Sequence, residues 1–151
     1  MSFHEGLVSV LKCDHGKTHA IVFMTQHSNG VLFQVFCKDL PAGKKGFHVH
    51  EKGNLIDYCK SLGSHYNPGN ERHGDLNELH SHRGDLGNII INENGTCDME
   101  FVSYKLTLNE LIGRSLVIHS KQDDLGHGGN TESLITGNSG SRLCCGIIGY
   151  A

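Results

Sequence analysis

The sequence predicts an all-β protein of about eight short strands, and three observations favour this class. Apolar residues make up 37% of the 151-residue chain, a fraction that suits strands with one buried and one exposed face. These residues occur as short runs and alternations rather than as a helical stripe. Finally, 20 glycines against 2 prolines indicate many turns and long ordered loops.

The first half of the chain shows strands separated by turn signals. Apolar runs predict strands at 7–11, 20–25 and 31–40. Asn29-Gly30 precedes the third strand, and this pair favours a hairpin because glycine accepts a positive φ at low cost. Pro41-Ala42-Gly43 is a further turn and ends that strand.

The second half continues the same pattern. Asn94-Gly95 is a second hairpin signal, and only 105–111 allows a short helix as an alternative. The remaining strands are expected at 47–50, 88–91, 96–104, 115–120 and 145–150.

Two segments, 52–84 and 121–143, do not fit strands. Connections of this length in a compact domain are usually functional or disordered. The first is rich in histidine, so bound metal would fix a segment that lacks a core of its own. We expect one domain spanning residues 1–151, with 52–84 as a metal and disulfide loop and 121–143 as a charged loop.

Charge and hydropathy exclude several classes of protein. The formal net charge is −3, whereas nucleic-acid binders carry clustered positive charge. No stretch approaches the roughly 20 apolar residues of a membrane span. The N-terminal sequence MSFHEGLVSV lacks the basic and apolar regions of a signal peptide. We therefore expect a cytoplasmic protein that binds neither nucleic acid nor membrane.

Side chains suited to metal binding are concentrated in the middle of the chain. Imidazole nitrogen suits copper and zinc, and a carboxylate among histidines suits zinc. Because sulfur ligands are missing from this set, a zinc finger or an iron–sulfur cluster is not expected. The candidate ligands are His48, His50, His65, His73, His82, Asp85 and His119.

Their spacing indicates two metal sites. His48 and His50 lie two residues apart on an expected strand, so both rings point to one face. With His119 and one loop histidine they form a four-nitrogen set that favours Cu(II). Three loop histidines and one aspartate form a closed set suited to structural zinc. The seven candidate side chains can provide four ligands to each metal only if one imidazole, through its two nitrogens, binds both metals.

Two points stay open from the residues alone. His80 competes with His82, because His80-Ser81-His82 has the same spacing as the strand pair. The six cysteines form no CxxC motif, so free thiols are the ordinary expectation in a reducing compartment. Six histidines are interpreted as solvated side chains: His4, His15, His19, His27, His80 and His127.

Seven ordered motifs together resemble the Cu/Zn superoxide dismutases, and the resemblance covers nearly the whole chain. Their order and gaps match the family closely from Gly46 onward. The motifs are GFHVHE (46–51), GSHYNP (63–68), RHGD (72–75), HRGDLGN (82–88), IGRSLVIH (112–119), DDLGHGGN (123–130) and TGNSGSRLCCGIIG (136–149).

The resemblance implies an eight-stranded Greek-key β-barrel, related to the immunoglobulin sandwich, with one copper and one zinc ion. It assigns copper to His48, His50, His65 and His119, and zinc to His65, His73, His82 and Asp85. His65 would bridge the metals. The family's H-x-G-D spacing selects His82 over His80, and Asp123 would link His48 with His73.

The resemblance also implies a disulfide between Cys59 and Cys145. Closing a loop of that size is worth roughly 4–5 kcal/mol in the chain-entropy model. The other four cysteines are expected to be buried or spare thiols: Cys13, Cys37, Cys97 and Cys144.

The implied activity is dismutation of superoxide into dioxygen and hydrogen peroxide. His65 would carry a proton between the half-reactions, and Arg142 would dock the anion with its fixed fork of donors. The main alternative is a non-catalytic copper and zinc buffer or chaperone-like domain. A zinc hydrolase fits less well, because the zinc set is closed and no nucleophile–base pair stands out.

Three departures from common family patterns carry further expectations. Ile135 stands where a lysine is common, so we expect weaker steering of superoxide. Lys52 replaces an aromatic residue at the family's dimer contact, although a homodimer is still expected through Gly53, Ile112, Gly113, Ile147 and Tyr150. Ser141 and Leu143 flank Arg142 where some relatives have proline, so we hypothesise copper loading that does not require a copper chaperone.

Overall fold

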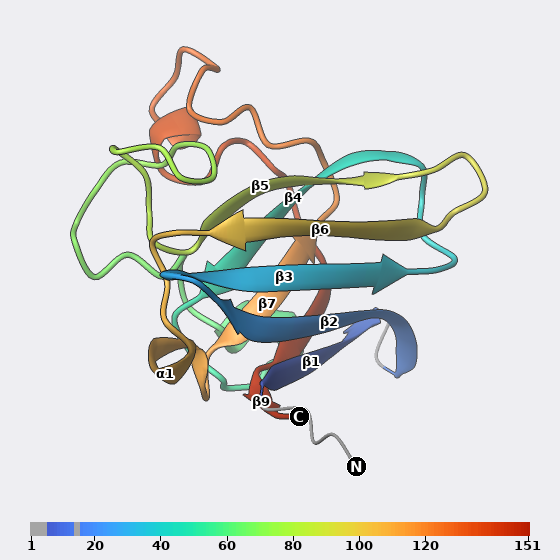
Figure 1. The fold of residues 1–151 in the computed structure, drawn as a ribbon. Coiled ribbons are helices and arrows are strands. Elements are labelled where there is room, and N and C mark those ends of the chain that lie inside the picture. The colour runs from blue at the N-terminus through green and yellow to red at the C-terminus, as the bar shows by residue number, and fades with distance from the viewer. Residues whose placement is uncertain (1–5, 14–15) are drawn as a thin grey trace.

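The computed structural model describes residues 6–13 and 16–151 and gives them an all-β architecture (Figure 1). Within these residues there are nine strands, one short α-helix and two 3₁₀ turns. The strands are β1 (Leu7–Cys13), β2 (Lys17–His27), β3 (Gly30–Cys37), β4 (Gly43–His50), β5 (Asp85–Ile91), β6 (Cys97–Ser103), β7 (Ser115–His119), β8 (Arg142–Ile147) and β9 (Gly149–Tyr150). The others are α1 (Leu108–Leu111), η1 (Tyr58–Ser61) and η2 (Glu132–Leu134).

The strands form one antiparallel sheet in the order β5-β4-β7-β8-β1-β2-β3-β6, and the short β9 pairs with β1. The end strands β5 and β6 also contact each other, so the sheet curls into a nearly closed barrel. Neighbours such as β3 and β6, or β4 and β7, are not consecutive in the chain, as a Greek key requires. The expected eight-stranded barrel is therefore confirmed.

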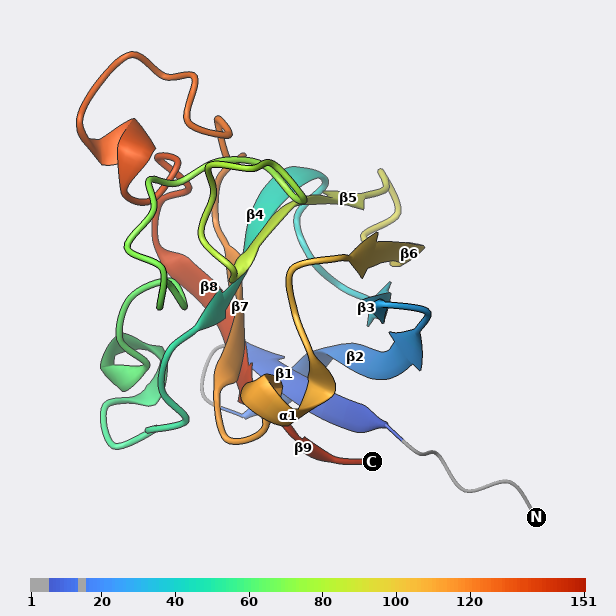
Figure 2. The ribbon, with the colours of Figure 1, turned by 60° about the vertical axis from the view of Figure 1, so that its left-hand side comes forward.

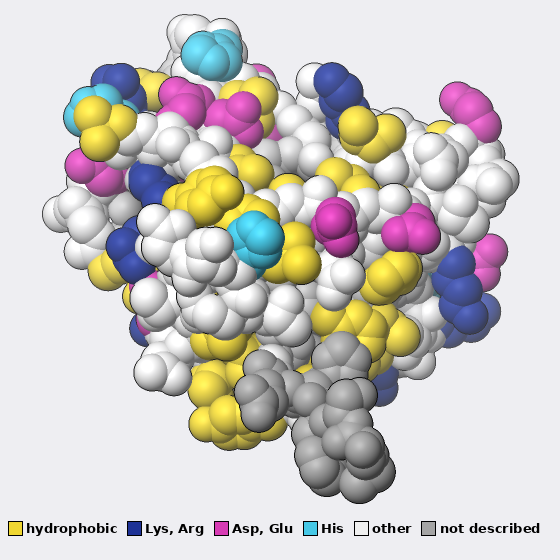
Figure 3. Space-filling model, in the orientation of Figure 1, with side chains coloured by type: hydrophobic (Ala, Val, Ile, Leu, Met, Phe, Trp, Pro, Cys, Tyr) yellow, Lys and Arg dark blue, Asp and Glu magenta, His cyan; other side chains and the backbone are white. Residues whose placement is uncertain are grey.

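Alternating side chains explain the strands on the front of the barrel in Figure 1. On β3, Val31, Phe33 and Val35 are fully buried, whereas Phe36 points outward and is 41% exposed. Phe33 stacks on Phe101 with ring centroids 5.3 Å apart. Figure 3 shows the outer face, where apolar side chains alternate with polar and charged ones. This half of the barrel therefore has one face buried in the core and one face exposed to solvent.

In the opposite half, β7, the second half of β4 and the middle of β8 are buried on both faces. Phe47 and Val49 belong to the barrel core, while His48 and His50 on the other face of β4 are also buried. Figure 2 shows why, because the segments 51–84 and 120–141 lie together beside these strands. These two long connections form an outer layer, and the candidate site lies between that layer and the barrel wall.

Backbone pairing and a small second core hold the first of these segments in place. Val49 N–H donates to Gly84 O at 2.8 Å, and the Val49 carbonyl oxygen accepts from Tyr66 N–H at 2.8 Å. Beneath the segment, a second cluster of buried residues packs on the outer face of β7 and β8. It consists of Cys59, Leu62, Val117 and Cys145.

Two disulfides are present among the described residues. Cys59 bonds Cys145, with Cα atoms 5.8 Å apart, and so ties the first long segment to β8. Cys13 bonds Cys144, and the expectation of free thiols at these two positions was wrong. Cys144 faces the barrel interior, opposite to Cys145, and lies directly across from Cys13 of β1 in the antiparallel register. Cys37 and Cys97 are free and buried, as expected.

Element boundaries differ from the predictions where polar residues begin a strand. β5 starts at Asp85 instead of residue 88, and β4 starts at Gly43 instead of residue 47. The expected last strand, 145–150, divides into β8 and β9 because its end leaves β7 and pairs with β1. The segment with the helical alternative contains α1, whose capping box joins Thr107 and Glu110.

Glu110 connects α1 to the first long segment. Its carboxylate accepts bonds from Arg83 Nε at 2.8 Å and Nη2 at 2.6 Å, and from the Tyr66 hydroxyl at 2.9 Å. Arg114 lies over the Tyr66 ring at 3.9 Å. Burial raises the pKa of Glu110, but hydrogen bonds from Arg83, Thr107 and Tyr66 outweigh it and lower the pKa to about 2.

We expect this network to make stability depend on pH. A carboxylate whose pKa falls on folding stabilises the fold above its ordinary pKa, and that contribution is lost as the pH falls toward 2. As the pH falls, the free energy of unfolding of the metal-free wild type should therefore drop by about 1–2 kcal/mol more than that of Glu110→Gln. This difference is smaller than the full linkage value, because solvent screens the pair. The Arg83 side chain is 37% exposed.

Urea unfolding at several pH values between about 5 and 2, with the disulfides intact, measures this difference. Glu93→Gln, which removes an exposed carboxylate from the β5–β6 turn, is the matched control. Equal pH dependence in wild type and Glu110→Gln would contradict the role of the network.

Candidate metal centre

His48 and His50 come from β4, where alternation sends Phe47 and Val49 inward and both imidazoles outward. His119 ends β7, the neighbour of β4. The first long segment adds His65 through an isolated β-bridge to His50. The barrel wall and the outer layer thus bring four histidines together.

These histidines, His48, His50, His65 and His119, are called the four-nitrogen set. One ring nitrogen from each lies within 4.8 Å of the others, and all four side chains are buried. His50 Nε2 and His119 Nε2 are 3.3 Å apart. His48 Nδ1 and His65 Nε2 are buried without a hydrogen-bond partner among the described residues. Buried orphan nitrogens facing one point are what a metal ion would satisfy.

The opposite nitrogens of three of these rings are fixed by oxygen atoms. His50 Nδ1 lies 2.9 Å from Gly63 O, and His119 Nδ1 lies 3.3 Å from Gly140 O. His48 Nε2 lies 2.6 Å from Asp123 Oδ2. Such partners hold the tautomer and the ring orientation of a metal ligand.

A second group, the mixed set, consists of His65, His73, His82 and Asp85. His65 Nδ1 is 3.2 Å from both His82 Nδ1 and Asp85 Oδ1. Asp85 Oδ1 is also 2.9 Å from His73 Nδ1 and 3.3 Å from His82 Nδ1. A tetrahedron with zinc–ligand bonds of 2.0–2.1 Å has edges of about 3.3 Å. The four separations therefore fit a tetrahedral zinc site.

A looser grouping includes His48 in place of His82, since its ligand atom also lies within 4.8 Å of His65, His73 and Asp85. This reflects stacking of the His48 ring on His65, with centroids 3.9 Å apart. We favour His82, because its Nδ1 lies at tetrahedral-edge distance from two members of the mixed set.

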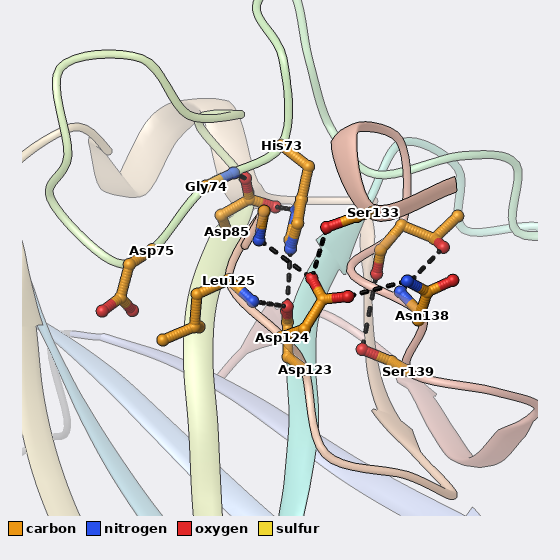
Figure 4. A network of polar contacts seen from close by, with 12 residues as sticks. His73, Gly74, Asp75, Asp85, Asp123, Asp124, Leu125, Ser133, Asn138 and Ser139 are labelled. Carbon is orange, nitrogen blue, oxygen red and sulfur yellow. Dashed lines mark hydrogen bonds and ion pairs between the residues drawn. The ribbon is translucent and has the colours of Figure 1, made fainter. Parts of the chain in front are cut away.

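Asp123 joins the two sets from outside. Its Oδ1 lies 2.7 Å from His73 Nε2 (Figure 4), while its Oδ2 contacts His48 Nε2. Asn88 fixes the aspartate backbone on both sides, accepting from Asp123 N–H at 2.7 Å and donating to Asp123 O at 3.0 Å. The residue thus lies where the family resemblance expected it.

Burial controls the protonation of the four-nitrogen set. Desolvation lowers the pKa of His119 to about 3, and it also lowers the pKa values of His48, His50 and His65. Neutral imidazoles keep a lone pair for a metal ion. These four rings are therefore ready to bind a cation at neutral pH.

The mixed set is different because it contains a carboxylate. Burial lowers the pKa of His73, but hydrogen bonds to Asp123 and Asp85 outweigh it and raise the pKa to about 9. The histidine contacts hold the pKa of Asp85 well below its usual range despite burial. A metal ion entering this set would therefore displace a proton from His73.

The remaining histidines lie outside both sets. His80 is exposed and its Nδ1 contacts Glu71 Oε2 at 3.2 Å, so the structure separates it from His82. His27 and His127 are exposed, and His19 is half-buried. His4 and His15 lie outside the described residues.

A pocket of about 470 Å³ opens beside the four-nitrogen set. Arg142, the first residue of β8, lines it, with Nη1 donating to Cys59 O at 2.7 Å and Nη2 to Gly63 O at 2.6 Å. Since Cys59 is also disulfide-bonded, the first long segment fixes the guanidinium. Burial lowers the pKa of Arg142. Other lining residues are His50, His65, His119, Lys121, Glu132 and Ile135.

Sequence reasoning missed a second carboxylate network next to Asp123. Asp124 accepts from Ser133 Oγ and from Asn138 Nδ2, both at 2.7 Å, and so gathers the segment 120–141 around one side chain (Figure 4). A Cβ on Gly137 would collide with Asp123, and its φ is +73°. The Asp123-Asp124 pair within DDLGHGGN was the available signal.

The comparisons agree with this geometry. The family model described as copper/zinc superoxide dismutase matches residues 18–148. The Cu-Zn superoxide dismutase of Cryptococcus neoformans var. grubii is 46% identical over 139 residues, covering 88% of this chain and 90% of the relative. The extracellular Cu-Zn superoxide dismutase of Drosophila melanogaster is 40% identical over 148 residues, covering 95% and 82%. The crystal structure of the clock protein EA4 aligns with a TM-score of 0.91 at 37% identity, covering 100% of this chain and 99% of that one.

The location of the protein is not settled by these findings. In the described part of the chain, no helix has the length and apolar character needed to cross a membrane. The relatives include extracellular proteins, so the cytoplasmic location expected from the sequence stays a prediction.

Proposed function

Because the chain belongs to the copper/zinc superoxide dismutase family, we propose that it converts superoxide into dioxygen and hydrogen peroxide at the four-nitrogen set. One observation carries this proposal. His65 presents one nitrogen to each of two ligand sets, and the same ring lines a pocket that also contains Arg142.

The donor atoms of both sets suit the two metals of the family. The four imidazoles His48, His50, His65 and His119 would hold copper, because nitrogen-only coordination favours it. The mixed set of His65, His73, His82 and Asp85 would hold zinc as a closed, structural site. Copper held by these residues would supply one-electron redox chemistry between Cu(II) and Cu(I).

The chain's own contribution to the reaction centres on His65. Its Nε2 lies in the four-nitrogen set without a hydrogen-bond partner among the described residues, so this nitrogen would hold a proton in the half-reaction in which it is not a copper ligand. It would give that proton to the reduced oxygen species in the other half-reaction, and a second proton from water would complete hydrogen peroxide. Nδ1 stays within the mixed set, which keeps the ring in place for both transfers.

Arg142 would bind the anion before electron transfer. Two carbonyl oxygens hold its guanidinium at the pocket, so the donors are already oriented when superoxide arrives. Lys121 lines the same pocket and adds positive charge. This local field matters because the whole chain carries a formal charge of −3.

We expect the metal-free protein to gain superoxide-removing activity when copper and zinc salts are added without a chaperone. In Arg142→Gln, kcat/KM should fall about 10- to 100-fold at unchanged metal content, because an oriented charge is lost. Arg142→Lys should retain part of the activity. Superoxide removal by pulse radiolysis, with metal analysis of the same samples, measures both effects.

Lys44→Gln, which removes the same charge from an exposed position on β4, is the matched control. A fully metallated wild-type protein that leaves superoxide untouched would refute the proposed activity and favour a metal buffer. Full activity in Arg142→Gln would refute the docking role alone.

Ile135 should weaken electrostatic steering, since it places an apolar side chain at the pocket rim and is 52% exposed. We expect Ile135→Lys to raise kcat/KM several-fold at low salt and to make it fall more steeply with ionic strength. Ile135→Gln introduces a polar side chain without the charge and should resemble wild type. The steering hypothesis fails if the salt dependence of Ile135→Lys equals that of Ile135→Gln.

We also propose a homodimer through the surface around Ile147. A Cβ on Gly53 would meet the Gly113 carbonyl and the Ile147 side chain, so these residues form one surface. Ile147 is 39% exposed and Tyr150 is 78% exposed, which leaves apolar area available for a second copy.

Sedimentation velocity at micromolar concentration should therefore show a dimer for the wild type. Ile147→Glu should shift the distribution to monomers, because a carboxylate would have to lose water in the contact. Ile90→Glu changes another exposed isoleucine, on β5, and should leave the dimer intact. A monomeric wild-type protein would contradict the proposed assembly.

A further inference from the structure

Cys37 and Cys97 face each other across two paired strands. Cys37 ends β3, Cys97 begins β6, and the two are direct partners in the antiparallel register. Their Sγ atoms lie 2.6 Å apart, and both side chains are buried. They are the two free cysteines of the described chain.

The backbone geometry at this position suits a disulfide. Directly opposed residues of antiparallel strands have Cα atoms about 4.5–5.5 Å apart, within the span of about 4.4–6.8 Å that disulfides bridge. The chain already bonds an opposed pair of this kind, because Cys13 and Cys144 are also register partners. Joining the Cys37 and Cys97 sulfurs therefore requires no rearrangement of the strands.

A disulfide at this position would also hold the edge of the sheet. β6 is the last strand in the sheet order, and among the described residues β3 is its one ladder partner. Cys37 and Cys97 are the final pair of that ladder. A covalent link there would fasten the edge strand to the sheet across a sequence separation of 60 residues.

The pair lies close to the surface of the protein. Both side chains belong to the buried core but keep a small exposed fraction, 7% for Cys37 and 4% for Cys97. Cys37 is also among the residues around a hollow of about 290 Å³, with Thr18, Ala20, Phe36 and Lys38. An oxidant as small as hydrogen peroxide therefore has a short path to these sulfurs.

We infer that Cys37 and Cys97 are a redox site that a peroxide oxidises to a third disulfide. One thiolate attacks a peroxide oxygen, the O–O bond breaks, and water leaves with a sulfenic acid on that sulfur. The second sulfur attacks the first, the S–S bond forms, the S–O bond breaks, and another water leaves. Two thiols thus lose two electrons and two protons, and hydrogen peroxide becomes two waters.

The two sulfurs are not equivalent in this reaction. Contact with Cys37 lowers the pKa of Cys97, while the same contact and burial raise the pKa of Cys37. Cys97 therefore forms the attacking thiolate first, and Cys37 closes the disulfide. The inference does not rest on the proposed function, because any source of hydrogen peroxide would serve.

The test treats the metal-loaded wild-type protein with increasing hydrogen peroxide and then alkylates it under denaturing, non-reducing conditions. Two cysteines should be alkylated before treatment and none afterwards. Before alkylation, the mass of the oxidised protein should be lower by two hydrogen atoms. Digestion without reductant should yield a cross-linked pair of peptides containing Cys37 and Cys97. The oxidised protein should also melt about 5–10 °C higher, as expected for a bridge closing a long loop.

Cys37→Ser and Cys97→Ser are the matched controls, and neither should show the melting shift. Peptide mapping of the wild type decides the question even if a variant fails to fold. Two thiols that stay alkylatable at peroxide concentrations sufficient to oxidise free dithiothreitol would overturn the inference. Added oxygen mass on Cys37 or Cys97 without a cross-link would overturn it as well.

Discussion

In the proposed metal centre, one imidazole faces two groups of candidate ligands at the same time, and the arrangement of the rest of the site depends on this. His65 Nδ1 lies 3.2 Å from His82 and from Asp85, while its Nε2 is turned toward the rings of the barrel wall. Neither set can move independently of the other. Asp123 provides the second link, because each of its oxygens holds one histidine from a different set.

This shared ring explains the two long connections. Neither contains enough apolar residues for a core of its own, and only a small cluster including Leu62 and Val117 lies beneath the first. Order comes instead from polar anchors with defined geometry, namely the Cys59 disulfide, the Arg83–Glu110 pair and the Asp124 network. A buried carboxylate with every oxygen engaged can hold a loop in one conformation.

Much of this could be predicted from the sequence, because strand periodicity projects residues onto known faces. The i, i+2 spacing of His48 and His50 was enough to place both rings on one side of β4. The spacing of the residues alone left His80 and His82 open, since both have the same chemistry, and only the family resemblance selected His82. The folded loop buries His82 and exposes His80. The Cys13–Cys144 bond and the Arg83–Glu110 pair depend on register and loop path. Neither the disulfide nor the ion pair can be recognised from the residue pattern of a single sequence.

The cysteine pairs occupy similar places in the fold. Each lies at a boundary of the hydrogen-bonded ladders of the barrel. The β1–β8 ladder comprises two residue pairs within the described chain, and one of them is Cys13–Cys144. Cys59 lies in η1, outside the strands of the described residues, and fastens the outer layer to β8. Cys37 and Cys97 close the ladder of the edge strand β6. Covalent bonds at such boundaries add most, because elsewhere cooperative ladders already hold neighbouring strands together.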